Sequence, residues 1–214
     1  MITRGQRTLD YLKKTVRRIY EAIKVTENKL YVEFPQIEPM LPEDIHFIHS
    51  EELLQMYPDM SPKERENAVT RQYRAVFIIG IGAELSDGRP HDGRSADYDD
   101  WSTLNEEGYM GLNGDLLLWN PVLESAFEIS SMGVRVDVEA LRWQLDMRGE
   151  ADNACLLYHR MLLDGKLPYT IGGGIGQSRL CMFLLRKAHI GEIQSSVWPE
   201  EMRLLCHNAG IDIV

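Results

Sequence analysis

The sequence predicts a single α+β domain. Its 214 residues match one ordinary domain, long enough to bury a core without disulfides or structural metals. Hydrophobic residues make up 44% of the chain and charged residues 26%, which is typical of a globular protein. Segments with helical periodicity alternate with short apolar runs typical of strands, and two of these runs are close enough to pair antiparallel. No linker or internal repeat divides residues 1–214.

The first expected element is an amphipathic helix. Its apolar residues recur at steps of three and four, at Leu9, Leu12, Val16, Ile19 and Ile23. A loop containing three prolines follows between residues 35 and 42. We expect a short strand around His46–His49, and then a small helix from Ser50 to Pro58.

A clear helix start comes next. Ser61 can cap the helix, Pro62 suits its first position, and Glu64 can bond back to the cap. The apolar run Ala75–Ile81 predicts a buried strand. Residues 82–111 form a long polar stretch rich in glycine and aspartate; because it contains Tyr98 and Trp101, we expect an ordered, functional loop.

Two strands are expected at Gly114–Trp119 and Ala126–Ser131, as an antiparallel pair. Helices should follow over Val138–Arg148 and Ala154–Leu163, each ended by a glycine. The last expected element is an apolar helix over Leu180–Leu185.

A glycine-rich segment precedes that helix, at a strand-to-helix junction. Gly172–Arg179 reads GxGxGxxR, and glycines let a backbone approach a ligand closely. The helix start offers free amide donors to an anion, and Arg179 can reach a phosphate. The spacing fits neither a Walker loop nor a dinucleotide fingerprint. The alternative is a tight turn that packs a helix on the sheet.

The segment around Glu128 is the second candidate for chemistry. Strand alternation places Glu128 and Ser130 on one face and Ile129 and Ser131 on the other, unless a bulge intervenes. A carboxylate on a buried face is costly unless it binds a metal or a base.

Asp115 lies on the neighbouring strand. With Glu128 it could hold Mg²⁺, which commonly takes one or two carboxylates plus substrate phosphates. Arg135 could clamp a carboxylate through both of its terminal nitrogens. The alternative is a surface hairpin whose charges are solvated.

The third candidate is the loop from Arg94 to Ser102. Its aspartates could bind an ammonium group or accept a proton, or they could cap turns in a polar loop. The histidines, including His46, His49 and His91, show no metal-binding spacing and are interpreted as structural or surface groups.

Charge and cysteine usage limit the partners. A net charge of −10 and the absence of a basic run argue against nucleic acid and anionic lipid. Three widely spaced cysteines indicate a reducing, cytoplasmic setting rather than disulfides or zinc. No signal peptide or transmembrane span is expected.

Four long segments together carry a family resemblance: DGRPHDGRSADYDDWST, GLNGDLLLWNPVLESAFEISSMGVRVD, TIGGGIGQSRL and HIGEIQSSVWP. In this order they resemble the ammonia-dependent asparagine synthetases, the aspartate–ammonia ligase family. The resemblance runs from about Leu9 to Pro199.

The resemblance implies a class II aminoacyl-tRNA synthetase-like antiparallel sheet flanked by helices. Members of the family have a substantial N-terminal portion that is missing here, so residues 1–214 are expected to be the C-terminal part of the catalytic domain. The family is homodimeric, and its dimer interface is expected to lie partly in the missing portion.

The implied reaction converts L-aspartate, ATP and ammonia into L-asparagine, AMP and pyrophosphate through β-aspartyl-AMP, with Mg²⁺ accompanying ATP. Asp99 and Arg179 are the implied catalytic residues. Asp115 and Glu128 would place the metal.

The remaining roles also come from the resemblance. Arg94, Asp99, Ser131 and Arg135 would bind the amino acid, with Asp99 also suited to hold a cationic nitrogen. ATP would lie against Glu128, Arg179 and four glycines: Gly172, Gly173, Gly174 and Gly176.

Two other functions stay open at this point. One is a noncatalytic relative that folds and binds ATP, or binds a partner through a sheet edge. The other is a synthetase that charges tRNA, against which stands the lack of a basic surface or anticodon-binding module.

Overall fold

A five-stranded sheet forms the centre of the chain. The computed structural model describes residues 1–214 and orders the strands β1-β2-β3-β4-β5. The strands are β1 (His46–His49), β2 (Ala75–Ile79), β3 (Asn113–Asn120), β4 (Ser125–Val134) and β5 (Ile171–Ile175). All neighbours are antiparallel except β1 and β2, which are parallel. This confirms the expected antiparallel sheet, with one parallel edge added.

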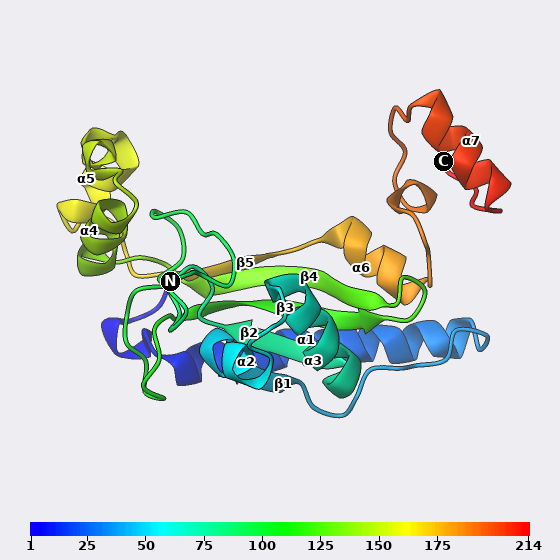
Figure 1. Ribbon diagram of the computed structural model, residues 1–214, viewed down its shortest axis with the longest axis horizontal. Helices are drawn as coiled ribbons and strands as arrows, with labels where there is room; N and C mark the ends of the chain where they lie inside the picture. Colours follow the sequence, from blue (N-terminus) through cyan, green and yellow to red (C-terminus); the bar gives the residue numbers. More distant parts are fainter.

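The long helix α1 (Leu9–Glu33) covers one face of the sheet (Figure 1). Thr8 caps it by accepting a hydrogen bond from the amide of Tyr11. Four of the apolar positions that predicted this helix are buried in a core shared with strand residues such as Phe77 and Leu116, and Ile19 is partly buried. The helix continues beyond the predicted Ile23, to Glu33, and Leu30 in this extension packs against the same core.

Two short helices, α2 (Ser50–Met56) and α3 (Pro62–Tyr73), cover the opposite face over β2 and β3. The predicted helix start at Ser61 is confirmed, since its hydroxyl accepts from the amide of Glu64 while the Glu64 carboxylate accepts from the Ser61 amide. The two faces are therefore covered by different helices, and α3 also reaches β4, where Ala126 packs in the same apolar cluster.

Helices also gather at the two ends of the sheet (Figure 1). At one end lie α4 (Val138–Met147), the 3₁₀ turn η2 (Ala151–Cys155) and α5 (Leu157–Leu163). The predicted helix Ala154–Leu163 was wrong at its start, because the extended backbone of Leu156 separates η2 from α5.

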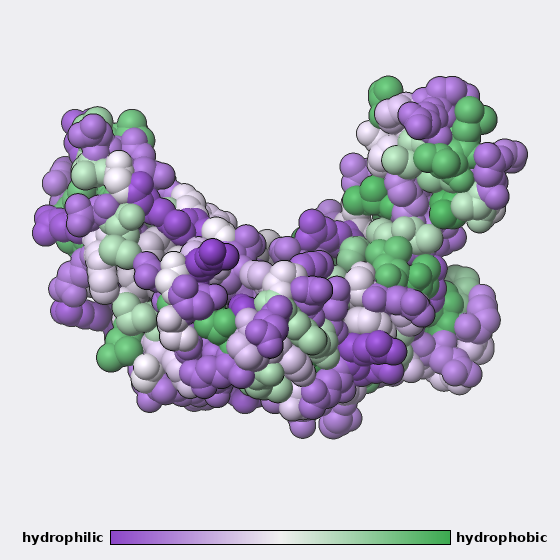
Figure 2. Space-filling view, in the orientation of Figure 1, coloured by the Kyte–Doolittle hydropathy of each residue, from purple (hydrophilic) through white to green (hydrophobic).

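Toward the other end lie α6 (Gln177–Leu184), the 3₁₀ turn η3 (Ile190–Glu192) and α7 (Glu200–Asn208). Helix α7 was not predicted from the sequence. Figure 2 shows a wide hollow between the two end groups. None of the helices is both long enough and apolar enough to cross a membrane.

Strand β4 contains an irregularity that decides which side chains share a face. Across β3 and β4, Leu116 pairs with Ser130, but Leu117 pairs with Glu128. Ile129 is therefore an extra residue without a partner in β3, as in a β-bulge.

The bulge changes which residues of β4 lie on the same face of the sheet. Ser130 lies opposite Leu116 on the α1 side, whereas Glu128 and Ser131 both lie on the other side, where Ser131 is opposite Asp115. The regular alternation that would put Glu128 and Ser130 on one face does not hold, because the bulge that the prediction excepted is present and shifts the alternation by one. Asp115, Glu128 and Ser131 thus lie on the same face of the sheet.

The glycine-rich segment is itself a strand. Ile171–Ile175 pairs antiparallel with β4, and its other edge has no strand partner. Its glycines fit because a side chain at Gly173 would overlap β4: an added Cβ would lie 2.3 Å from that of Met132. The tight-turn alternative was wrong, and the following helix begins at Gln177 rather than Leu180.

The long loop 82–111 is ordered, as predicted. Isolated β-bridges join Glu84 to Pro90 and Leu104 to Met110 within it. A third bridge joins Asp99 to Arg135 at the end of β4. The loop is thereby fixed to the polar face of the sheet.

Candidate functional site

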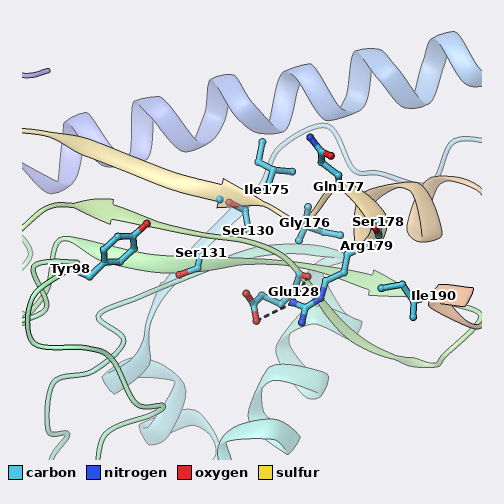
Figure 3. A pocket seen from close by; sticks show the side chains of 12 residues that line it. Tyr98, Glu128, Ser130, Ser131, Ile175, Gly176, Gln177, Ser178, Arg179 and Ile190 are labelled. Atoms are coloured by element: carbon cyan, nitrogen blue, oxygen red, sulfur yellow. Dashed lines mark hydrogen bonds and ion pairs between the residues drawn. The ribbon is translucent and has the colours of Figure 1, made fainter. Parts of the chain in front are cut away.

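A cleft of about 590 Å³ opens on the polar face of β4, between β5, the start of α6 and loop residue Tyr98 (Figure 3). Predicted residues that line it include Glu128, Ser131, Gly174 and Arg179. The bulge in β4 is the reason that Glu128 and Ser131 reach this cleft together.

Arg179 lies in the first turn of α6 and reaches back across the cleft. Its Nη1 donates to the backbone oxygen of Glu128 at 3.2 Å and lies 3.5 Å from Oε2 of the same residue. Gly176 precedes the helix, and no side chain caps the helix amides. An arginine and free amide donors at one point form a site suited to phosphate.

Arg94 and Asp115 form the first of two buried ion pairs beside this cleft. Arg94 comes from the long loop, and its Nη2 donates to Oδ2 of Asp115 on β3. The other carboxylate oxygen of Asp115 is buried without a hydrogen-bond partner. Burial raises the pKa of Asp115, against the opposing effect of Arg94. The alternative of a hairpin with solvated charges was therefore wrong for Asp115.

Asp99 and Arg135 form the second ion pair. Arg135 donates through Nη1 to Asp99 Oδ1, and its guanidinium lies over the ring of Tyr98, 3.7 Å from the centroid. Gly133 makes room for the carboxylate, because an added Cβ would lie 2.9 Å from Asp99 Cγ. Burial raises the pKa of Asp99 to about 6, although Arg135 opposes this rise.

This pKa makes a testable prediction for stability. An unfolded aspartate keeps a pKa near 3.8, so the folded state holds the Asp99 proton more tightly. The resulting stabilisation is full below the unfolded pKa and is lost as pH rises through about 6. As the pH rises from below 3.8 to above about 6, the unfolding free energy of the wild type should fall by about 3 kcal/mol relative to that of Asp99→Asn. Urea unfolding of both chains at a series of pH values measures it, and a pH-independent difference would contradict it.

Asp115 and Glu128, the predicted metal ligands, lie on the same face of adjacent strands. Asp115 has a free buried oxygen and Glu128 is partly exposed, so both offer the hard oxygen ligands that Mg²⁺ prefers. No three acidic, histidine or cysteine side chains converge in the chain. A magnesium ion here would take its other ligands from phosphates and water.

The four predicted glycines divide into two pairs. Gly174 and Gly176 line the large cleft, whereas Gly172 and Gly173 line a separate cavity of about 120 Å³ beside α1. Gly172 also lies under the guanidinium of Arg135.

The difference between two of these glycines can be tested. An added methyl at Gly174 meets no atom within 4 Å, whereas at Gly173 it meets the backbone and side chain of β4. Gly173→Ala should lower the unfolding free energy by about 1–3 kcal/mol, the usual cost of overpacking. Gly174→Ala should leave it within about 0.5 kcal/mol and only narrow the cleft. Urea unfolding compares the two, and equal losses would show that the β4–β5 contact is misplaced.

The structure brings the predicted residues other than Gly172 and Gly173 into one region, with the two ion pairs beside the cleft. Tyr98 received no role from the sequence. Its position next to Asp99 was the only available signal, and its contact with Arg135 depends on folding.

The sheet, its helices and this cleft define the class of protein. The fold is that of class II aminoacyl-tRNA synthetases. The chain is similar to asparaginyl-tRNA synthetase from Pyrococcus horikoshii (TM-score 0.62, 16% identity, 90% of this chain and 48% of that one). It is also similar to the Entamoeba histolytica asparaginyl-tRNA synthetase in complex with asparaginyl-adenylate (TM-score 0.56, 17% identity, 87% and 42%). At these identities the likeness shows the fold alone.

Within that class, the chain belongs to the aspartate–ammonia ligase family, which it matches over residues 1–210. It is 59% identical to the aspartate–ammonia ligase of Parabacteroides distasonis over all 214 residues. The chain spans 62% of the length of that curated relative.

Proposed function

We propose that the chain is the C-terminal part of a catalytic domain that converts L-aspartate, ATP and ammonia into L-asparagine, AMP and pyrophosphate. In the first step, a side-chain carboxylate oxygen of aspartate attacks the α-phosphorus of ATP, and the bond to pyrophosphate breaks. In the second step, ammonia attacks the activated carbonyl carbon, the bond to the AMP oxygen breaks, and the nitrogen loses a proton.

One observation carries this proposal: two arginine–carboxylate pairs lie beside a cleft that has an arginine at a helix start. A reaction between an amino acid and ATP needs cationic groups for phosphates and carboxylates, and an anionic group for a cationic nitrogen. The cleft and its two ion pairs supply both kinds of group in one region.

The ATP side of the site would be formed by α6 and β5. Arg179 and the free amides at the start of α6 would hold phosphates, while Gly174 and Gly176 leave room for the nucleotide. Asp115 and Glu128 would hold a magnesium ion, whose charge would neutralise developing negative charge on the phosphates.

The amino-acid side would be formed by the two ion pairs. Arg94 and Arg135 would hold carboxylates, and Ser131, which lines the cleft and lies opposite Asp115, would contact the amino acid. Asp99 would hold the ammonium ion or the incoming ammonia, because its carboxylate is enclosed and pairs with Arg135. We further propose that the protein acts in the cytoplasm as a homodimer, as the family resemblance implies.

An isotope experiment tests the reaction. The purified chain is incubated with ATP, ammonium and L-aspartate labelled with ¹⁸O in its side-chain carboxylate. Because that oxygen stays with AMP when ammonia displaces it, we expect asparagine and ¹⁸O-labelled AMP in equal amounts. Asparagine formed together with ADP, or with unlabelled AMP, would contradict a β-aspartyl-AMP intermediate.

A second candidate is a noncatalytic protein that binds ATP or a partner chain. It is favoured by the outer edge of β5, which has no strand partner and could accept an added strand. ATP binding in calorimetry without formation of AMP or asparagine would support this candidate.

A further inference from the structure

Arg7 is a buried arginine that contacts two separate segments of the chain, at Asp100 and at residues 135–137. It follows the 3₁₀ turn η1 (Arg4–Gln6), and only 6% of its side chain is exposed. Nη2 lies 2.6 Å from Asp100 Oδ2 and Nε lies 3.1 Å from Asp137 Oδ2. Nη1 donates to the backbone oxygen of Arg135. Each nitrogen of the guanidinium thus has its own acceptor.

Asp100 connects Arg7 to the neighbouring loop residues through hydrogen bonds. Its side chain is fully buried, and its Oδ1 accepts from the amides of Ser102 at 3.1 Å and Thr103 at 2.9 Å. The Asp100 amide donates to the backbone oxygen of Val134 on β4. Asp100 is therefore fixed on both sides, and so is its neighbour Asp99.

The backbone of Arg135 is held by two hydrogen bonds. Its amide donates to the backbone oxygen of Thr170, and its own backbone oxygen accepts from Arg7. Asp99 and Arg135 are bridge partners in the backbone as well as an ion pair. The single side chain of Arg7 thus contacts the backbone of one partner and the residue next to the other.

We propose that Arg7 is a positioning residue, which clamps together the two segments that carry Asp99 and Arg135. The proposal rests on the proposed function, because it concerns the shape of the amino-acid side of that site. Arg7 itself touches neither the cleft nor the Asp99 carboxylate. Lysine cannot replace it, since a lysine has one nitrogen and the three acceptors lie in different directions.

Two variants test the clamp. Arg7→Lys keeps the charge but loses the planar fork. Arg7→Met combined with Asp100→Asn removes the fully buried pair, while Asp137 is 24% exposed and keeps the hydrogen bonds that cap α4. The matched control is Arg186→Met, because Arg186 pairs with the buried Glu27 in another part of the fold.

The first readout is the mobility of Arg135, which needs no catalysis. In ¹⁵N-arginine-labelled, ligand-free chain, hydrogen exchange at Nε of Arg135 is measured by NMR and assigned with Arg135→Lys. In both clamp variants the Nε hydrogen of Arg135 should exchange about tenfold faster than in the wild type. This is the change expected when one hydrogen bond to a charged group is lost. Arg186→Met should exchange at the wild-type rate. Wild-type exchange in either clamp variant overturns the proposal.

The second readout separates positioning from folding. In the asparagine assay, we expect both clamp variants to raise KM for aspartate about tenfold while KM for ATP stays within twofold, because the clamp holds only the amino-acid side. An equal rise in both KM values indicates a general structural role and overturns the proposal. If the wild-type chain forms no asparagine, the proposed function fails while the exchange rates still decide on the clamp.

Discussion

Replacing Asp99 with asparagine is expected to reduce asparagine synthesis by about 100-fold or more, the usual scale for losing a charged group that stabilises a transition state. Asp99 is 1% exposed and is paired with Arg135, so the neutral amide cannot hold an ammonium ion and leaves the arginine without its counter-ion. The measurement is the rate of asparagine formation under saturating ATP and varied ammonium. We expect the ammonium dependence to weaken most.

Asp97→Asn is the matched control for this experiment. Asp97 lies two residues earlier in the same loop, but its carboxylate faces His159, 3.2 Å from Nε2. It should change the rate by less than about threefold, as a surface substitution does. A wild-type rate in Asp99→Asn would refute the role assigned to Asp99.

The second large effect is expected for Arg179→Ala. Its guanidinium is the cationic group at the start of α6 that faces the cleft, so its loss should lower formation of AMP and pyrophosphate by about 100-fold. Its side chain is about half exposed, so folding should be unaffected. Pyrophosphate release at varied ATP measures the effect.

Two further variants make this experiment specific. Arg179→Lys keeps the charge without the fork and should recover only part of the activity. Arg142→Ala removes an exposed arginine from α4 and should have no effect. Equal activity of the wild type and Arg179→Ala would remove Arg179 from the proposed ATP site.

The sequence predicted those elements whose signals are local. Apolar residues at steps of three and four predicted α1, and the cap at Ser61 predicted the start of α3. Both signals depend on neighbours only a few residues away. Element ends were less accurate, as at α1, where the helix continues to Glu33.

What the sequence could not predict depends on contacts between distant segments. The residues Arg94, Asp99, Asp115 and Arg135 were identified individually, but no spacing shows that Arg94 pairs with Asp115 and Asp99 with Arg135. The strand at Ile171–Ile175 was missed for the same reason: its glycines resemble a turn until β4 lies beside them. The family resemblance supplied the roles of these residues but not their geometry.

The extra residue Ile129 allows two polar side chains three residues apart to share one face of β4. In a regular strand, Glu128 and Ser131 would point to opposite sides of the sheet. Deleting Ile129 would leave a regular ladder, with Glu128 still opposite Leu117 and Ser131 still opposite Asp115. This strand should therefore tolerate the loss of that one residue without moving its polar groups to the other face.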